Sequence, residues 1–215
     1  MSREKELVKN TIILSLGSFL PQLTSLITLP LLTAYLTKVE YGTYDLINTV
    51  ISLIIPIITL RIESAAFRFM IEYRKEAGKS KQIVSTILIF CIFSSVLVFL
   101  LTSLIFYSIP LVDRILIMLY STFHIVLSDL LQIARGNSQN FKFSMAAIIN
   151  SVIYMCLTII FTKVILMGLS GILLSLIAGE IIASFYLILS MRMDKVFSYK
   201  SFSVKVLKKM LQYSW

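Results

Sequence analysis

Six long hydrophobic stretches follow one another along this chain, separated by short polar segments. A helix of about 20 apolar residues crosses the hydrocarbon layer of a bilayer. Each stretch is at least that long, and we place them near residues 11–36, 44–70, 83–107, 113–134, 143–163 and 168–190. The pattern predicts an all-α integral membrane protein that folds as a six-helix transmembrane bundle.

Polar residues form a continuous face on the second stretch. They recur at steps of three or four residues: Asp45, Thr49, Ser52, Pro56, Thr59 and Glu63, with Asn48 adjoining. Since 18 residues make five helical turns, Asp45 and Glu63 would point in the same direction. A carboxylate near the centre of a span costs around 3 kcal/mol on insertion scales. We therefore expect Glu63 to face a watery cavity or a cationic partner.

The first stretch carries a second polar face, made of Thr11, Ser15, Ser18, Gln22, Ser25 and Thr28. Small polar residues of this kind hold transmembrane helices together or line a cavity, and the pattern leaves both interpretations open.

Two arginines lie nearly opposite the carboxylate face of the second stretch. Arg68 is close enough to the cytoplasmic end to reach the interface and to pair with Glu72 one turn later. Arg61 lies about two turns deeper, where it would either anchor the helix or else form an ion pair or bind an anionic ligand.

The fourth stretch holds the single histidine of the chain, His124, on one face with Ser121, Ser128 and Arg135, whereas Asp129 points well away. A lone histidine on a helix is either a hydrogen-bonded packing residue or a proton acceptor. It does not predict a metal site, because the sequence offers no second histidine.

The sixth stretch combines a packing ridge with a carboxylate at mid-membrane, Glu180. The ridge of small residues at four-residue steps, Gly171, Ser175, Gly179 and Ala183, predicts close approach of a neighbouring helix. Glu180 lies beside it and is either a hydrogen-bonded carboxyl in that interface or an ion-coupling acid.

Composition agrees with a membrane protein, since 58% of residues are hydrophobic and 14% are charged. The net charge of +9 does not indicate nucleic-acid binding, because the basic residues gather in the polar segments beside alternate ends of the spans. The positive-inside rule then places both chain ends in the cytoplasm, where basic residues also contact anionic membrane lipids. Domain limits follow: a cytoplasmic tail at 1–10, the transmembrane lobe at 11–190, a basic cytoplasmic linker at 191–209 and the start of a truncated seventh helix at 210–215.

Several short motifs carry a family resemblance. The junction between the first two spans reads LLTAYLTKVEYGTY over residues 31–44, followed by RIESAAFRF over residues 61–69. Further on, ARGN at residues 134–137 precedes FKF at residues 141–143. In this order the motifs resemble those of bacterial polysaccharide lipid flippases, the O-antigen and capsule exporters of the multidrug/oligosaccharidyl-lipid/polysaccharide superfamily.

The resemblance implies one six-helix lobe of a twelve- or fourteen-helix exporter in the bacterial inner membrane. The implied activity is transfer of an undecaprenyl-diphosphate-linked oligosaccharide to the periplasmic leaflet, without a cofactor and driven by an H⁺ or Na⁺ gradient. We expect the substrate to meet Arg61, Gln22, Asn48 and Arg135. The candidate ion-coupling residues are Asp45, Glu63, His124 and Glu180.

Other functions stay open. A drug or metabolite exporter of the same superfamily would share these features. An inactive truncated fragment is another alternative, since this chain would need a second lobe or another copy to cover its polar faces. A membrane-embedded lipid-modifying enzyme would need His124 with a carboxylate, yet Asp129 lies about 140° away around the helix at about 100° per residue. The sequence therefore predicts a transporter and not an enzyme.

Overall fold

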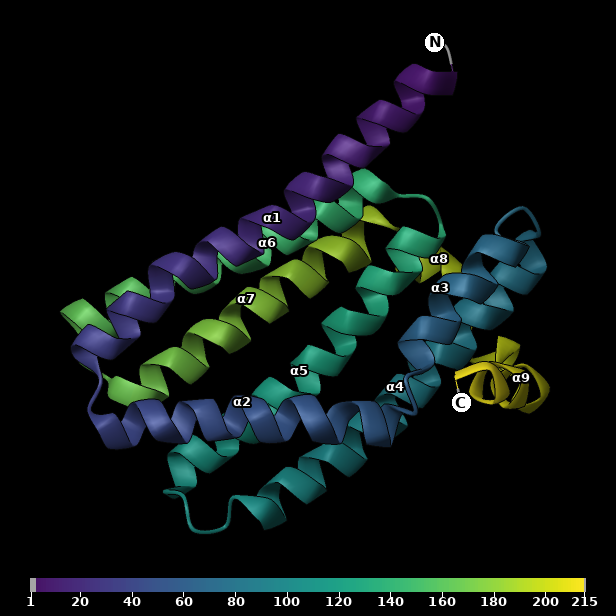
Figure 1. The fold of residues 1–215 in the computed structure, drawn as a ribbon. Helices are drawn as coiled ribbons and strands as arrows, with labels where there is room; N and C mark the ends of the chain where they lie inside the picture. The colour runs from purple at the N-terminus through teal and green to yellow at the C-terminus, as the bar shows by residue number, and fades with distance from the viewer. Residues whose placement is uncertain (1–2, 215) are drawn as a thin grey trace.

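The long helices run side by side in the computed structural model, which describes residues 3–214 (Figure 1). These are α1 (Arg3–Tyr35), α4 (Ala77–Ile105), α5 (Leu111–Gly136), α6 (Asn140–Ile159) and α7 (Gly168–Ser190), with α2 (Lys38–Thr59) crossing them. Six helices are long and apolar enough to cross a membrane. The predicted all-α bundle with six spans is therefore confirmed.

The second predicted span, 44–70, is wrong as a single helix. The chain leaves the helix after Thr59, because Leu60 and Arg61 both adopt left-handed backbone angles, with φ of 50° and 51°. A new helix, α3 (Ile62–Tyr73), starts in another direction. Asp45 and Glu63 thus lie on different helices, and the predicted continuous carboxylate face does not form.

Burial explains why the chain breaks there. The turn lets α3 pack a face against α4 and α5 that consists of Ile62, Ala65, Ala66 and Met70, each 0% exposed. A left-handed residue other than glycine costs roughly 1–2 kcal/mol, and burying one large aliphatic side chain gains about 1.5–3 kcal/mol. The apolar contacts of α3 therefore outweigh the two strained residues.

The junction between α1 and α2 is held by a capping box. The Thr37 backbone N–H and hydroxyl donate to Glu40 Oε2 at 2.9 and 2.7 Å, and the Glu40 N–H donates to the Thr37 hydroxyl at 3.2 Å. The Glu40 carboxyl also lies against Gly168 and Leu169 at the start of α7. The acidic residue of the EYG motif thus starts α2 and joins it to α7.

Small residues set the closest helix contacts. A Cβ on Gly179 of α7 would lie 2.8 Å from the Asn150 backbone oxygen of α6. A Cβ on Gly17 of α1 would lie 2.7 Å from the Ser144 Cβ of α6, whose hydroxyl donates to the Ile13 carbonyl at 2.7 Å. The predicted ridge on the sixth span is confirmed as packing, because all of its members are buried: Gly171, Ser175, Gly179 and Ala183.

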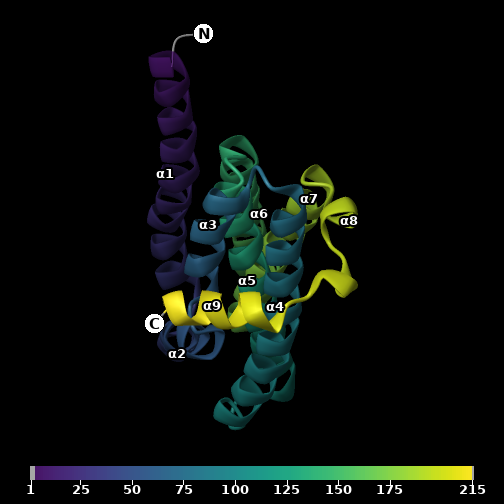
Figure 2. The same ribbon diagram turned by 90° about the vertical axis from the view of Figure 1, so that its right-hand side faces the viewer.

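Short elements complete the chain. The π-helix η1 (Ile160–Val164) ends the fifth span, and α8 (Met193–Val196) and η2 (Tyr199–Ser201) lead to α9 (Val204–Ser214). In Figure 2, α9 lies across the direction of α1 and α4. The last helix starts at Val204 and not at the predicted residue 210, and Trp215 lies outside the described residues. At the other end, α1 begins at Arg3, so most of the predicted tail 1–10 continues the first helix; Met1 and Ser2 lie outside the described residues.

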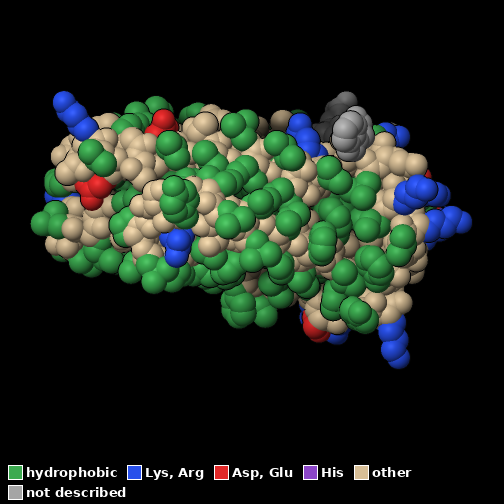
Figure 3. Space-filling model, turned by 90° about the horizontal axis from the view of Figure 1, so that it is seen from below, with side chains coloured by type: hydrophobic (Ala, Val, Ile, Leu, Met, Phe, Trp, Pro, Cys, Tyr) green, Lys and Arg blue, Asp and Glu red, His purple; other side chains and the backbone are tan. Residues whose placement is uncertain are grey.

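Surface composition matches a membrane setting. Hydrophobic side chains cover the middle of the face seen in Figure 3, and Lys and Arg side chains gather mainly towards one end. The start of α1, the α3–α4 and α5–α6 junctions and α9 all lie at one end of the bundle (Figure 1). This is the end that the positive-inside rule assigns to the cytoplasm. The chain is a multi-pass membrane protein.

Candidate functional site

A hydrogen-bonded pair of titratable side chains, one on α5 and one on α7, forms the centre of the site. His124 Nδ1 lies 2.7 Å from Glu180 Oε1. The Glu180 side chain is only 4% exposed, whereas the His124 side chain is 47% exposed. The pair therefore joins a buried carboxyl to a ring that is open to the exterior of the lobe.

The second carboxyl oxygen of Glu180, Oε2, is buried and has no hydrogen-bond partner among the described residues. The Ser184 hydroxyl, one turn along α7, is buried and likewise unpaired within the described chain. A buried carboxylate without compensation is strongly unfavourable in an apolar medium. The charge of Glu180 thus depends on the protonation of His124.

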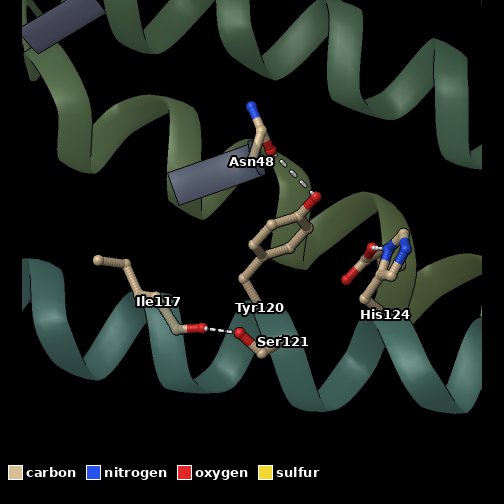
Figure 4. A network of polar contacts seen from close by, with 6 residues as sticks. Asn48, Ile117, Tyr120, Ser121 and His124 are labelled. Atoms are coloured by element: carbon tan, nitrogen blue, oxygen red, sulfur yellow. Dashed lines mark hydrogen bonds and ion pairs between the residues drawn. The ribbon is translucent and has the colours of Figure 1, made fainter. Parts of the chain in front are cut away.

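Aromatic and amide side chains extend this pair to α2. The Tyr120 ring centroid lies 5.7 Å from that of His124, one turn away on α5. The Tyr120 hydroxyl donates to Asn48 Oδ1 at 3.4 Å, as Figure 4 shows. Ser121, also on this face, donates to the Ile117 carbonyl at 2.7 Å and so stays within its own helix.

Two further tyrosines, close enough to Tyr120 to interact with it electrostatically, extend the site to α1 and α6. The Tyr44 and Tyr154 hydroxyls share a hydrogen bond of 3.2 Å between α2 and α6. Thr28 of α1 and Thr158 of α6 lie beside the Tyr154 hydroxyl. We call these connected side chains the polar network, which consists of Thr28, Tyr44, Asn48, Tyr120, His124, Tyr154, Thr158 and Glu180. It brings together α1, α2, α5, α6 and α7.

The sequence identified only part of this network. Asn48, His124 and Glu180 were predicted site residues, and the structure brings them together through Tyr120. The tyrosines were missed because an aromatic residue in a hydrophobic stretch contributes to the apolar pattern and its hydroxyl leaves no periodic signal. The position of Tyr120 one turn before His124 was the one available clue.

A separate buried carboxyl lies between α5, α3 and α4. Asp129 is 2% exposed and points away from His124, as the helical periodicity predicted. Its neighbours include Cys91 of α4 and Glu63 of α3, and its Oδ2 atom has no hydrogen-bond partner in the described part of the chain. Glu63 thus lies near Asp129 and not near Asp45.

The remaining predicted residues lie outside the polar network. Asp45 and Arg61 are exposed, and the side chains of both lack an ion pair within residues 3–214. Arg61 is the left-handed residue before α3, and its carbonyl accepts a hydrogen bond from the Ser214 hydroxyl at 3.3 Å. Gln22 lies in a shallow groove along α1 beside Ser15 and Ser18.

Two arginines have aromatic partners that the sequence did not indicate. The Arg135 guanidinium lies 4.8 Å from the Phe67 ring centroid and 5.9 Å from that of Phe143. The Arg68 guanidinium lies 4.3 Å from the Tyr213 ring centroid. The predicted Arg68–Glu72 pair does not form in the described structure. Stacking on an aromatic face is a natural use of the planar guanidinium.

The fold and the site define a polytopic membrane bundle with a polar network inside its membrane-spanning part. A model of the family described as "Polysaccharide biosynthesis protein" matches residues 7–215. The chain belongs to this family. A comparison with curated protein sequences finds no match.

Solved structures show the same fold. The chain is similar to an outward-facing multidrug resistance MATE family transporter of the MOP superfamily, with a TM-score of 0.77 and 14% identity over 95% of this chain and 49% of that one. It is also similar to a MOP superfamily transporter from Pyrococcus furiosus, with a TM-score of 0.73 and 13% identity over 96% of this chain and 50% of that one. The chain therefore spans about half the length of these transporters. The predicted membership of a polysaccharide family is confirmed by the family match, and the chain has the fold of about half of each of these transporters.

Proposed function

We propose that this chain is the N-terminal lobe of a flippase that moves an undecaprenyl-diphosphate-linked oligosaccharide from the cytoplasmic to the periplasmic leaflet of a bacterial inner membrane. The product would supply surface polysaccharide such as O-antigen or capsule. The match to the polysaccharide biosynthesis family over residues 7–215 is the observation that carries this proposal. A second lobe, or another copy of this chain, would complete the transport pathway.

In this proposal the substrate meets polar side chains of α1 and α2, the two spans with the smallest share of buried residues. Gln22 of α1 is exposed, and Asn48 of α2 is part of the polar network. Arg61 would bind the diphosphate, because a guanidinium donates two parallel hydrogen bonds to phosphate oxygens. Arg135 would contribute at the cytoplasmic side, although its guanidinium already stacks on Phe67.

We assign ion coupling to the His124–Glu180 pair. His124 is the accessible partner and can exchange a proton with water, whereas Glu180 is buried. Loss of the His124 proton would leave the pair with a net negative charge inside the bundle. A buried charge without its partner is destabilising by about 3–5 kcal/mol, enough to favour another arrangement of α5 and α7. Asp45 and Glu63 stay predictions as coupling acids.

The test measures translocation of a lipid-linked oligosaccharide in proteoliposomes that contain the full-length protein. Arg61→Ala should abolish translocation at unchanged protein abundance. The matched control is Arg192→Ala, because Arg192 is also exposed and also left-handed with φ of 51°. Equal activity of the two variants would remove Arg61 from the substrate site.

A multidrug exporter is the second candidate, favoured by the fold match to a multidrug resistance MATE family transporter. The two functions differ in their substrates. Cells that lack the flippase would accumulate lipid-linked oligosaccharide in the cytoplasmic leaflet and lose surface polysaccharide. Cells that lack a drug exporter would keep their polysaccharide and become sensitive to cationic or amphipathic drugs.

A further inference from the structure

A groove of about 220 Å³ lies between α3, α4 and α9, and its lining shares no residue with the polar network. Its lining includes three lysines and an amide together with apolar and aromatic side chains. The lysines are Lys79, Lys205 and Lys209, and the apolar side chains include Phe69 and Val206. We call this site the basic groove.

The basic groove is fixed in place because α9 is docked on the bundle. Met210 of α9 is 0% exposed, and the Tyr213 ring packs edge-on to Phe69 with 6.3 Å between ring centroids. The linker before α9 is also attached to α4. The Ser198 N–H donates to the Ser85 hydroxyl at 3.0 Å, and the Ser203 N–H donates to the Thr86 hydroxyl at 3.3 Å.

The position of α9 matches the membrane surface. The helix lies across the spanning helices and is seen nearly end-on in Figure 1 and from the side in Figure 2. A helix perpendicular to membrane spans lies parallel to the bilayer plane. Val204 is 67% exposed and lines an open apolar surface with Leu207 and Leu211. An apolar face bordered by lysines is typical of helices that lie in the headgroup region.

The charges around the basic groove are mostly positive. Lys79 Nζ lies 2.9 Å from Glu76 Oε2 and 4.7 Å from the Tyr73 ring centroid, and Glu72 is also near it. Lys205 and Lys209 have no ion-pair partner within the described residues. Their two positive charges are therefore available to an anion.

We propose that the basic groove binds the phosphate of an anionic phospholipid from the cytoplasmic leaflet. Basic pockets between transmembrane helices on this side bind acidic headgroups. The apolar part of the lining, Phe69 and Val206, suits the glycerol and acyl ends of a lipid and gives nothing to a free phosphate ion. A lysine ammonium acts as a point charge and lacks the planar, bidentate geometry of arginine. The site therefore prefers anionic to zwitterionic lipids but does not select one particular anionic headgroup. This proposal does not depend on which molecule the protein transports.

The experiment is native mass spectrometry of the delipidated full-length protein, titrated with phosphatidylglycerol or with phosphatidylcholine of the same chain length. Each lysine near a membrane surface adds about fivefold to affinity for an anionic lipid. A Lys205→Gln, Lys209→Gln double variant should therefore bind phosphatidylglycerol roughly 25-fold more weakly. The control is Lys195→Gln, Lys200→Gln, which removes the same charge from exposed linker positions outside the groove.

The outcomes separate the possible anions. The proposal holds if the groove variant loses the preference for phosphatidylglycerol, the control keeps it, and a Lys205→Arg, Lys209→Arg variant retains it with unchanged thermal unfolding. An equal loss in the control would show diffuse electrostatic attraction and overturn the site. Full displacement by millimolar inorganic phosphate would make it a soluble-anion site. Stronger binding of undecaprenyl diphosphate than of phosphatidylglycerol would make it a substrate entry site.

Discussion

Replacing His124 with alanine should destabilise the lobe far more than replacing its partner. His124→Ala removes the cationic partner of a carboxyl that is only 4% exposed. Glu180→Gln instead removes the buried charge and keeps a hydrogen-bonding group of the same shape beside a ring that is half exposed. The same ion pair is broken in both variants, yet only the first leaves a buried charge uncompensated.

The magnitude follows from the least costly response of the His124→Ala variant, which is to protonate Glu180. An ordinary glutamic acid has a pKa of about 4.3, so holding it neutral at pH 7 costs about 3.7 kcal/mol. This sets the expected loss in unfolding free energy at about 3–4 kcal/mol, close to that measured for broken buried pairs. Glu180→Gln should lose about 1 kcal/mol or less, since the amide can still hydrogen-bond to His124.

The assay is reversible unfolding in mixed detergent micelles. The control is Thr122→Ala on the same helix, because within the described residues its hydroxyl donates to the Met118 carbonyl of its own helix. In His124→Ala the unfolded state ionises Glu180 and the folded state does not, so stability should rise as pH falls from 7 towards about 4.3. The double variant His124→Ala, Glu180→Gln should recover most of the loss. Equal losses in both single variants, or no recovery in the double variant, would refute the reasoning.

Three further predictions concern the scaffold, each read from thermal unfolding of the purified protein. Gly179→Ala should lower the unfolding free energy by about 1–3 kcal/mol through overpacking, because the new Cβ meets Asn150. The control Gly42→Ala should be neutral or stabilising, because a Cβ there has nothing within 4 Å. Equal effects of the two variants would contradict the close contact between Gly179 and Asn150. Thr37→Ala should lower stability by about 0.5–2 kcal/mol through loss of the α2 cap, and an unchanged melting temperature would show that the cap is dispensable. Arg61→Gly should relieve a left-handed backbone and raise stability by about 1 kcal/mol; a loss would indicate that the Arg61 side chain stabilises the fold.

Much of the architecture could be predicted because spanning a bilayer demands long apolar helices. The hydrophobic stretches therefore located the spans, and the spacing of small residues located the packing ridge of α7. The break after Thr59 could not be predicted in this way. Pro56 marked only a local weakness in α2, and the direction of α3 depends on burial of Ile62 and Met70 against helices that are remote in sequence.

The sequence pointed to residues of the polar network where one residue type is rare, and it missed the contacts that only the tertiary structure creates. His124 and Glu180 were candidates because an ionisable group in a membrane span needs a partner. Their pairing across α5 and α7 was not visible, since 56 residues separate them. The predicted carboxylate face of Asp45 and Glu63 required one unbroken helix, and the chain breaks between these two residues.

Burial differs strongly among the membrane spans. In the most apolar windows of α1 and α2 only 17% of residues are buried, against 50% in α4 and in α7. The two exposed helices are those that carry Gln22 and Asp45, and polar groups facing hydrocarbon are unfavourable. The exposed polar side chains of α1 and α2 therefore need polar surroundings in the membrane. The half-exposed ring of His124 belongs to the polar network, which reaches α2 through Asn48 and α1 through Thr28, so the least buried helices and the accessible titratable group lie on one connected set of side chains.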